Sequence, residues 1–236
     1  MSTFGPKGIV GYISPSTIQF PSEINVLLPE GFGVVASVLD VRAHTDEQFK
    51  AARLKLDDAL RALAGEGAQA IVVDGVPVAI WDGYQAELEM WRDFSQKHGV
   101  PINSGIGSAV EGFRHLGVTR LVVATAYLPL INDRLAVYFQ QAGFEVFAIE
   151  GLAVRDPAEA ARLDPTAYGD LARRLIADHP QADGIFLSGR GNLLSVGVDL
   201  ERQIDRPVLT ARQGGIWWLM RTLGAPFGYG RLLASL

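Results

Sequence analysis

The chain has 236 residues, of which 48% are hydrophobic, so it can bury a sizeable core and does not have the composition of a disordered segment. Its net charge is −5 and it contains no cluster of lysines and arginines, so it has no electrostatic footprint for binding nucleic acid. It contains no cysteine, which excludes disulfides, thiolate metal ligands and a cysteine nucleophile.

Signals of export and of membrane insertion are also missing from the sequence. The segment from Met1 to Lys7 has no apolar run of the signal-peptide type. The apolar stretch from Ile71 to Trp81 is interrupted by Asp74 and is too short to span a bilayer. We therefore expect a cytoplasmic protein without membrane or nucleic-acid partners, and the sequence leaves its oligomeric state open.

Short apolar runs alternate along the chain with longer segments of helical pattern. The runs are near-continuous in Val, Ile and Leu, which is typical of buried parallel strands. In chain order, the predicted strands are 8–13, 32–38, 70–73, 100–103, 120–125, 145–149, 184–187 and 207–210. The predicted helices between them are 46–64, 84–98, 108–116, 132–141, 165–177 and 215–222.

The second half of the chain resembles the first. Three segments recur in the same order: 9–12 as 122–125, 70–75 as 184–189, and 101–102 as 207–208. Strands that are separated by single helices form right-handed βαβ units and parallel sheets. We therefore predict an α/β fold of two pseudo-symmetric lobes, each a parallel sheet flanked by helices, with the active-site cleft between them. The first lobe is expected to comprise residues 1–116 and 212–236, and the second residues 117–211.

The turns that follow the strands are expected to hold the functional residues, because ligands of such folds bind outside the carboxyl ends of the strands. The candidates in these turns are Ser14, Pro15, Asp74, Gly75, Val76, Pro77, Tyr127, Ser188, Gly189, Arg190, Gly191, Asn192 and Gln213. Ser14, Pro15, Val76, Pro77 and Gln213 are expected only to line the cleft.

The segment from Ser188 to Asn192 has the strongest local pattern, since two glycines flank an arginine directly after a buried strand. Exposed backbone N–H groups in such a turn can hold an anionic oxygen, as can those of Gly75, and Arg190 can bind a carboxylate through two hydrogen bonds. The other interpretation is a tight strand-to-helix turn with a solvated arginine.

Asp74 ends a strongly apolar strand. A carboxylate that is partly desolvated there would have a raised pKa and could donate or accept a proton. The other interpretation is a turn aspartate that accepts hydrogen bonds from nearby backbone N–H groups.

Tyr127 could donate its hydroxyl to an oxyanion, although a tyrosine at a strand end can equally serve packing. Ser188 is a further catalytic candidate, but the sequence shows no base to activate it. Of the four histidines, only His44 follows a strand in a way that could face the cleft.

Other catalytic signatures are absent. The first strand is not followed by G-x-G-x-x-G, and the sequence has no P-loop, G-x-S-x-G or H-E-x-x-H motif. No clustered set of His, Asp and Glu indicates a metal site. We therefore expect neither a metal nor an organic cofactor.

Several motifs resemble those of one family. The segment 124–127, followed by Asn132, Asp133 and Arg134, is similar to the A-T-x-Y…N-E-R segment of arylmalonate decarboxylases and maleate isomerases, which belong to the aspartate/glutamate racemase superfamily. The segments 183–189 and 228–232 resemble that family's D-G-I-x-L-S-C and the decarboxylases' closing G-Y-G-R-L. The resemblance implies two pseudo-symmetric α/β lobes with the active site between them.

The chain departs from this family at the residues that matter most. The resemblance implies that racemases and isomerases use one cysteine from each lobe, at the positions of Gly75 and Gly189 here, and that arylmalonate decarboxylases keep the second as the proton donor. This chain lacks both cysteines. Their absence excludes racemisation by two cysteine bases and removes the proton donor of the decarboxylases. The decarboxylases' Thr-Ser, part of their oxyanion site, is replaced by Val76 and Pro77, and Pro77 has no N–H group to donate.

Together, the residues and the resemblance predict a cofactor-independent lyase or isomerase that acts on a small carboxylate or dicarboxylate through an enediolate-like or carbanion-like intermediate. Asp74 is expected to do the acid–base work, Arg190 to anchor the substrate, and Tyr127 with the Gly189 turn to bind the oxyanion. Two alternatives stay open: a non-catalytic relative that binds a small acid, and a hydratase or hydrolase in which Asp74 activates water.

Overall fold

The computed structural model describes residues 4–16, 23–155, 157–225 and 230–233. The strands are β1 (Gly8–Ser14), β2 (Phe32–Val38), β3 (Ala70–Val73), β4 (Ile102–Ser104), β5 (Arg120–Thr125), β6 (Glu145–Gly151), β7 (Gly184–Ser188) and β8 (Val208–Thr210). The longer helices are α2 (Asp46–Leu54), α3 (Leu56–Gly65), α5 (Tyr84–His98), α6 (Gly105–His115), α7 (Pro129–Gln141), α9 (Thr166–Asp178), α10 (Leu193–Ile204) and α11 (Ala211–Thr222). The short helical segments are α1 (Glu23–Leu27), α4 (Val76–Ala79), the 3-10 turn η1 (Ile80–Asp82), α8 (Pro157–Arg162) and α12 (Gly230–Leu233).

Within the described residues, the strands form two parallel four-stranded sheets, in the orders β2-β1-β3-β4 and β6-β5-β7-β8. The two orders are the same arrangement repeated four strands later, as the internal repeat predicts. The α/β fold with two pseudo-symmetric lobes is therefore confirmed. The predicted limits of the lobes, 1–116 with 212–236 and 117–211, stay a prediction.

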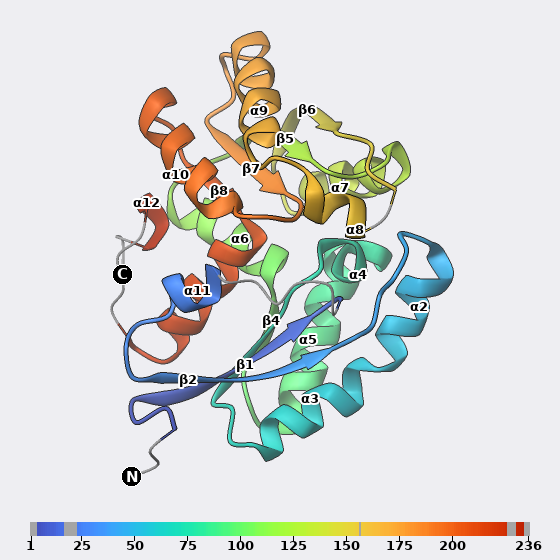
Figure 1. Ribbon diagram of the computed structural model, residues 1–236, viewed down its shortest axis with the longest axis vertical. Coiled ribbons are helices and arrows are strands. Elements are labelled where there is room, and N and C mark those ends of the chain that lie inside the picture. The colour runs from blue at the N-terminus through green and yellow to red at the C-terminus, as the bar shows by residue number, and fades with distance from the viewer. Residues whose placement is uncertain (1–3, 17–22, 156, 226–229, 234–236) are drawn as a thin grey trace.

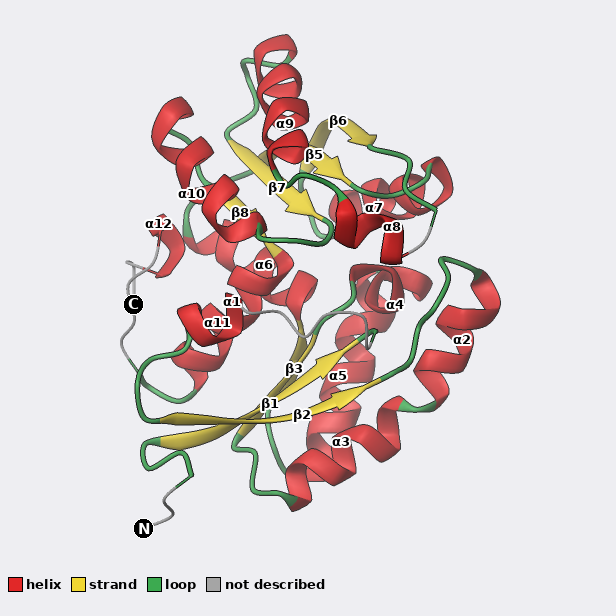
Figure 2. Ribbon diagram, viewed as in Figure 1, coloured by secondary structure: helices red, strands yellow, loops and turns green. Residues whose placement is uncertain are grey.

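Helices α6 and α11 lie between the two sheets and pack closely on each other (Figures 1 and 2). A Cβ added at Gly214 would lie 2.6 Å from the Cα of Ala109, so this approach requires glycine. Each helix begins directly after a strand, and the side chains of Ser104 and Thr210 cap their N-termini. The first turns of both helices are thereby held at the junction of the lobes.

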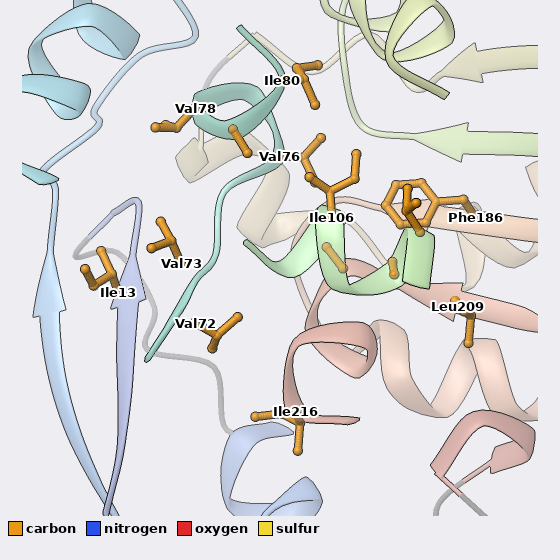
Figure 3. Packing of buried hydrophobic residues seen from close by; sticks show 14 of the residues in the cluster. Ile13, Val72, Val73, Val76, Val78, Ile80, Ile106, Phe186, Leu209 and Ile216 are labelled. Atoms are coloured by element: carbon orange, nitrogen blue, oxygen red, sulfur yellow. The ribbon is translucent and has the colours of Figure 1, made fainter. Parts of the chain in front are cut away.

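One of two apolar clusters of buried residues extends across both lobes. It includes Val73 at the end of β3, Ile106 on α6, and Phe186 and Leu209 on strands of the second sheet. Figure 3 shows Ile106 between the side chains of the first lobe and those of the second. Because the lobes share one core, the turns at their junction are held at fixed positions relative to one another.

Three predicted helix starts were wrong, and all were placed too late: the helix expected at 132 begins at Pro129, and two others differ similarly. The helices expected at 108 and 215 begin at Gly105 and Ala211. In α11, the Thr210 hydroxyl accepts the N–H of Gln213, and the Gln213 side chain accepts the N–H of Thr210, which is a complete capping box. The segment expected to be a loop before α11 is therefore its first turn.

The predicted helix 46–64 is divided at Lys55 into α2 and α3. The N–H of Lys55 bonds to the carbonyl of Ala52, three residues back, and the lysine ammonium bonds to the carbonyl of Leu39. Helix α10 was not predicted, because its buried face includes Gly197 and Glu201 and therefore does not look apolar in the sequence. The sequence also predicts an ordered loop at 226–230, of which residues 226–229 lie outside the described residues and Gly230 begins α12.

Candidate active site

A pocket lies between the lobes, where the carboxyl ends of strands from both sheets meet. Its wall is formed by the turns after β1, β3, β5, β7 and β8, with part of the loop after β2. The cavity volume is about 80 Å³. A water molecule needs roughly 10–15 Å³ on this measure, so the cavity has room for a small organic molecule.

Most of the residues predicted for the site lie in this wall. They are Ser14, Pro15, Asp74, Gly75, Val76, Pro77, Tyr127, Ser188, Gly189 and Arg190. Gly191, Asn192 and Gln213 are not part of it. Asn192 is the exposed N-cap position of α10, directly after Gly191. The amide oxygen of Gln213 accepts the N–H of Thr210 at 3.0 Å, so its side chain belongs to the cap of α11 and not to the cleft.

Asp74 follows β3, and its carboxylate has three donors. It accepts hydrogen bonds from the Tyr12 hydroxyl and from the N–H of Gly75, the latter at 2.9 Å, and it pairs with Nη2 of Arg212 at 3.5 Å. Burial raises the pKa of Asp74, while the bonds from Tyr12 and Gly75 oppose this rise. Asp74 thus bonds the turn, as one interpretation expects, and its carboxylate also lines the pocket with a raised pKa, so the acid–base role stays a prediction.

Arg212 and Glu23 were missed by the sequence analysis. Arg212 lines the pocket from the first turn of α11, and its Nη1 forms an ion pair with Glu23 of α1. Glu23 also accepts the N–H of Leu194 at 2.6 Å. Arg212 could have been found because it follows β8 at its carboxyl end, but no signal in the sequence connects Glu23 with the site.

Tyr127 and Ser188 form a hydroxyl pair in the wall contributed by the second lobe. Their oxygens are 2.8 Å apart, and both side chains are buried. Burial raises the pKa of Tyr127 far above its usual value, so its hydroxyl stays neutral and can donate a hydrogen bond. A neutral phenol is not a base that could activate Ser188, so this pair is suited to binding an oxyanion and not to nucleophilic attack.

The Thr-x-Tyr…Asn pattern holds Tyr127 in place. The hydroxyl of Thr125, at the end of β5, accepts the N–H of Tyr127 at 2.9 Å and donates to Oδ1 of Asn132 at 2.7 Å. All of these groups are buried. The motif therefore ties the turn after β5 to helix α7 and fixes where the tyrosine enters the pocket.

Both glycine turns leave no room for a side chain. Gly75 has a φ of +111°, and a Cβ there would lie 2.9 Å from the Cβ of Pro15. At Gly189 the obstacle is the ring of Tyr168, whose Cζ would lie 2.5 Å from an added Cβ. Tyr168 is completely buried, so its ring cannot easily move away.

The turn after β7 offers fewer N–H groups to a ligand than the sequence indicates. The N–H of Arg190 donates to the hydroxyl of Tyr168 at 3.4 Å. The Arg190 side chain is half-buried and lines the pocket, where its charge favours the ionised form of Asp74. One N–H group of the turn that was expected to hold an anion is therefore already engaged, while the Arg190 side chain lines the pocket.

Part of the pocket lining is apolar. Val41, Phe49 and Val78 belong to it, and His44 lies among them. The imidazole is stacked on Phe49 with ring centroids 6.2 Å apart, and it meets Tyr127 edge-on at 6.0 Å. His44, a lesser candidate from the sequence, thus does face the pocket.

No group of three or more His, Cys, Asp and Glu side chains that could hold a metal ion occurs among the residues that the structure describes. In the same part of the chain, no helix combines the length and the apolar character needed to cross a bilayer.

Comparison with known proteins identifies the family. The family model for arylmalonate decarboxylase matches residues 9–233. The chain is 28% identical to the arylmalonate decarboxylase of Bordetella bronchiseptica over 225 residues, which cover 93% of each protein. It is also 28% identical to a maleate isomerase of Nocardia farcinica over 137 residues, which cover 56% of this chain and 54% of that protein.

Solved structures agree with this match. A liganded variant of arylmalonate decarboxylase superimposes with a TM-score of 0.88 at 25% identity, covering 97% of this chain and 100% of the other. The maleate cis-trans isomerase of Nocardia farcinica, at 20% identity, shares the fold with a TM-score of 0.86, covering 97% of this chain and 98% of that one. The chain therefore belongs to the arylmalonate decarboxylase family.

Proposed function

We propose that this protein is a cofactor-independent lyase or isomerase that acts on a small carboxylate or dicarboxylate through an enediolate-like intermediate. One observation supports this proposal above all. A buried carboxyl group with a raised pKa, Asp74, and a neutral hydroxyl pair, Tyr127 and Ser188, border the same cavity of about 80 Å³. An acid–base group and an oxyanion site are the two elements that proton chemistry next to a carboxylate requires. The decarboxylases and isomerases to which the chain is similar make this class of reaction the best-supported one.

In a decarboxylation, the bond between the α-carbon and the departing carboxylate breaks, so that the carboxylate leaves as carbon dioxide and the electron pair of the bond stays on the α-carbon. The remaining carboxylate delocalises this pair as an enediolate, whose added charge the Tyr127 hydroxyl can stabilise. Asp74 in its protonated form then transfers its proton to the α-carbon, so that its O–H bond breaks as the C–H bond forms. Solvent returns a proton to Asp74. In an isomerisation, ionised Asp74 would remove a proton from the α-carbon and return it to another carbon over which the charge of the intermediate is delocalised, so that the position of the double bond changes.

Arg190 is proposed to anchor a substrate carboxylate. Its guanidinium can bind both oxygens through parallel hydrogen bonds, which orients the carboxylate as well as neutralising it. A cytoplasmic location and the lack of a cofactor complete the proposal.

The roles are tested by Asp74→Asn and Arg190→Ala in turnover assays with malonates, maleate and related diacids. Asp74→Asn preserves the shape of the side chain and should abolish turnover. Arg190→Ala should mainly raise KM. Asp58→Asn and Arg61→Ala, which remove an exposed ion pair on α3, are the matched controls and should leave turnover unchanged. Undiminished turnover in both site variants would reject these roles.

A second candidate is a protein that binds a small acid without converting it. The blocked glycine turns favour it, because neither Gly75 nor Gly189 can be replaced by a residue with a proton-donating side chain unless its neighbours move. Thermal-shift measurements with the same diacids separate the two candidates, since stabilisation without product formation would favour binding. Solvent ¹⁸O in the product would instead identify a hydratase or hydrolase.

A further inference from the structure

A row of buried ionisable groups extends from α1 through α11 to the acid–base group of the pocket. Glu23 pairs with Nη1 of Arg212, Nη2 of Arg212 pairs with Asp74 at 3.5 Å, and Asp74 accepts the hydroxyl of Tyr12. The side chains of Glu23, Arg212 and Asp74 are only 5%, 13% and 15% exposed. The function proposed above uses Asp74 but assigns nothing to Arg212 or Glu23.

The position of Arg212 is determined by the backbone as well as by these ion pairs. It lies in the first turn of α11, between Thr210 and Gln213, which form the capping box. Helix α1, which carries Glu23, packs on α11. The guanidinium is therefore held from both sides, and its planar fork of donors can pair with a separate carboxylate at each end.

Charges this close and this well buried act strongly on one another, because little water screens them. A cation beside Asp74 favours the ionised carboxylate, whereas a second carboxylate behind that cation weakens its effect. Other groups also face Asp74. Tyr12 of β1 is a neutral donor, since burial raises its pKa, and Arg190 and Tyr127 approach from the second lobe. His44 borders the same pocket from the loop after β2.

We propose that Arg212 is a positioning residue, which orients the carboxyl group of Asp74 and sets its ionisation, and that Glu23 holds Arg212 in place. The effect of Arg212 on turnover rests on the proposed function, whereas its effect on the position and ionisation of Asp74 does not. It makes α1, remote from the site in the sequence, a part of the active site.

Three variants test the proposal: Arg212→Gln, Arg212→Lys and Glu23→Gln. The direct readout is the ¹³C carboxyl resonance of Asp74 in protein labelled at aspartate, assigned by its loss in Asp74→Asn and followed across a pH titration. Arg212→Gln should raise the pKa of Asp74, because the neighbouring cation is gone. Glu23→Gln should lower it, because the competing carboxylate is gone. Arg212→Lys should retain most of the wild-type titration.

The pKa of Asp74 should thus shift in opposite directions in Arg212→Gln and Glu23→Gln. A merely structural role of these residues would not produce opposite shifts. Arg221→Gln, an exposed position on the same helix, is the matched control and should leave the titration unchanged. Arg212→Gln leaves Glu23 buried without its cation and can fail to fold, in which case the double variant Glu23→Gln with Arg212→Gln replaces it. The double variant should still raise the pKa of Asp74, since the nearer charge dominates.

Turnover provides the second readout. In Arg212→Gln the carboxyl group of Asp74 is displaced, so kcat should fall on the order of a hundredfold. KM should change little in the same variant. An unchanged Asp74 titration in Arg212→Gln, or shifts of the same sign in Arg212→Gln and Glu23→Gln, would overturn the proposal. If the wild-type protein converts no acid at all, the proposed function fails, yet the titration still decides the role of Arg212.

Discussion

The contact between Gly189 and Tyr168 leads to the sharpest prediction about this protein, the effect of Gly189→Cys. An added Cβ would lie 2.5 Å from Cζ of Tyr168, whereas real Cβ atoms essentially never approach another atom closer than 3.0 Å. Tyr168 is completely buried, so the strain must be absorbed by the surrounding core. Overpacking of this kind costs about 1–3 kcal/mol. In a chain of this length the cost corresponds to a decrease in Tm of about 2–12 °C.

A double-mutant cycle isolates this contact. Tyr168→Ala alone should cost about 3–5 kcal/mol, the usual range for removing a buried aromatic ring. In the Tyr168→Ala background, Gly189→Cys should cost almost nothing, because the ring that it strikes is gone. Urea denaturation measures each unfolding free energy. Gly65→Cys is the control, since Gly65 is exposed and a Cβ there meets nothing within 4 Å. An equal cost of Gly189→Cys in both backgrounds would show that Tyr168 is not what blocks this position.

Three further predictions follow from the site and the core. Tyr127→Phe should lower kcat on the order of a hundredfold to a thousandfold by removing an oxyanion donor, with Ser188→Ala as its comparison in the same steady-state assay. Unaltered kcat in Tyr127→Phe would exclude that role. Gly75→Ala should destabilise the protein by more than about 1 kcal/mol in urea, because its φ is +111° and Pro15 lies against the added methyl group, and an unchanged denaturation midpoint would contradict this. Burial raises the pKa of Glu87 in the folded state, so its contribution to stability is present below the unfolded carboxyl pKa and is lost as the pH rises through the folded value. Glu87→Gln should therefore show a shallower fall of unfolding free energy with rising pH than the wild type, and equal slopes would refute the assignment.

The strands were predictable because their signal is local. The runs 120–125 and 184–187 have apolar centres without interruption, at 121–124 and 185–187, and they became β5 and β7 almost unchanged. The likeness of the two sheets followed from the internal repeat, since two similar sequences fold into similar lobes, whereas the order of the strands within each sheet came from the structure. Helix α10 escaped prediction because Gly197 and Glu201 lie on its buried face, where Glu201 accepts the N–H of Val208 and is thereby satisfied. Such compensation depends on a neighbouring segment and is not visible in the helix itself.

Some residues of the candidate site were likewise predictable from the sequence, and others were not. Asp74, Tyr127 and Arg190 could be named from the sequence, because each follows a predicted strand at the end where ligands bind. Gln213 was assigned wrongly to the cleft, because the sequence does not reveal that its side chain closes a capping box. Tyr168 could not be anticipated at all, since its importance lies only in the volume that it occupies.

By itself, the sequence determined the parallel strands, the twin halves and the turns that would face one another, because hydrophobic runs and repeats are properties of neighbouring residues. Only the tertiary structure decided which groups surround the pocket. Glu23 and Arg212 are 189 residues apart in the chain, and they meet because α1 packs on α11. The electrostatics and the free space of a buried site depend on all the side chains that pack around it. Packing therefore determines both, and the order of residues along the chain does not.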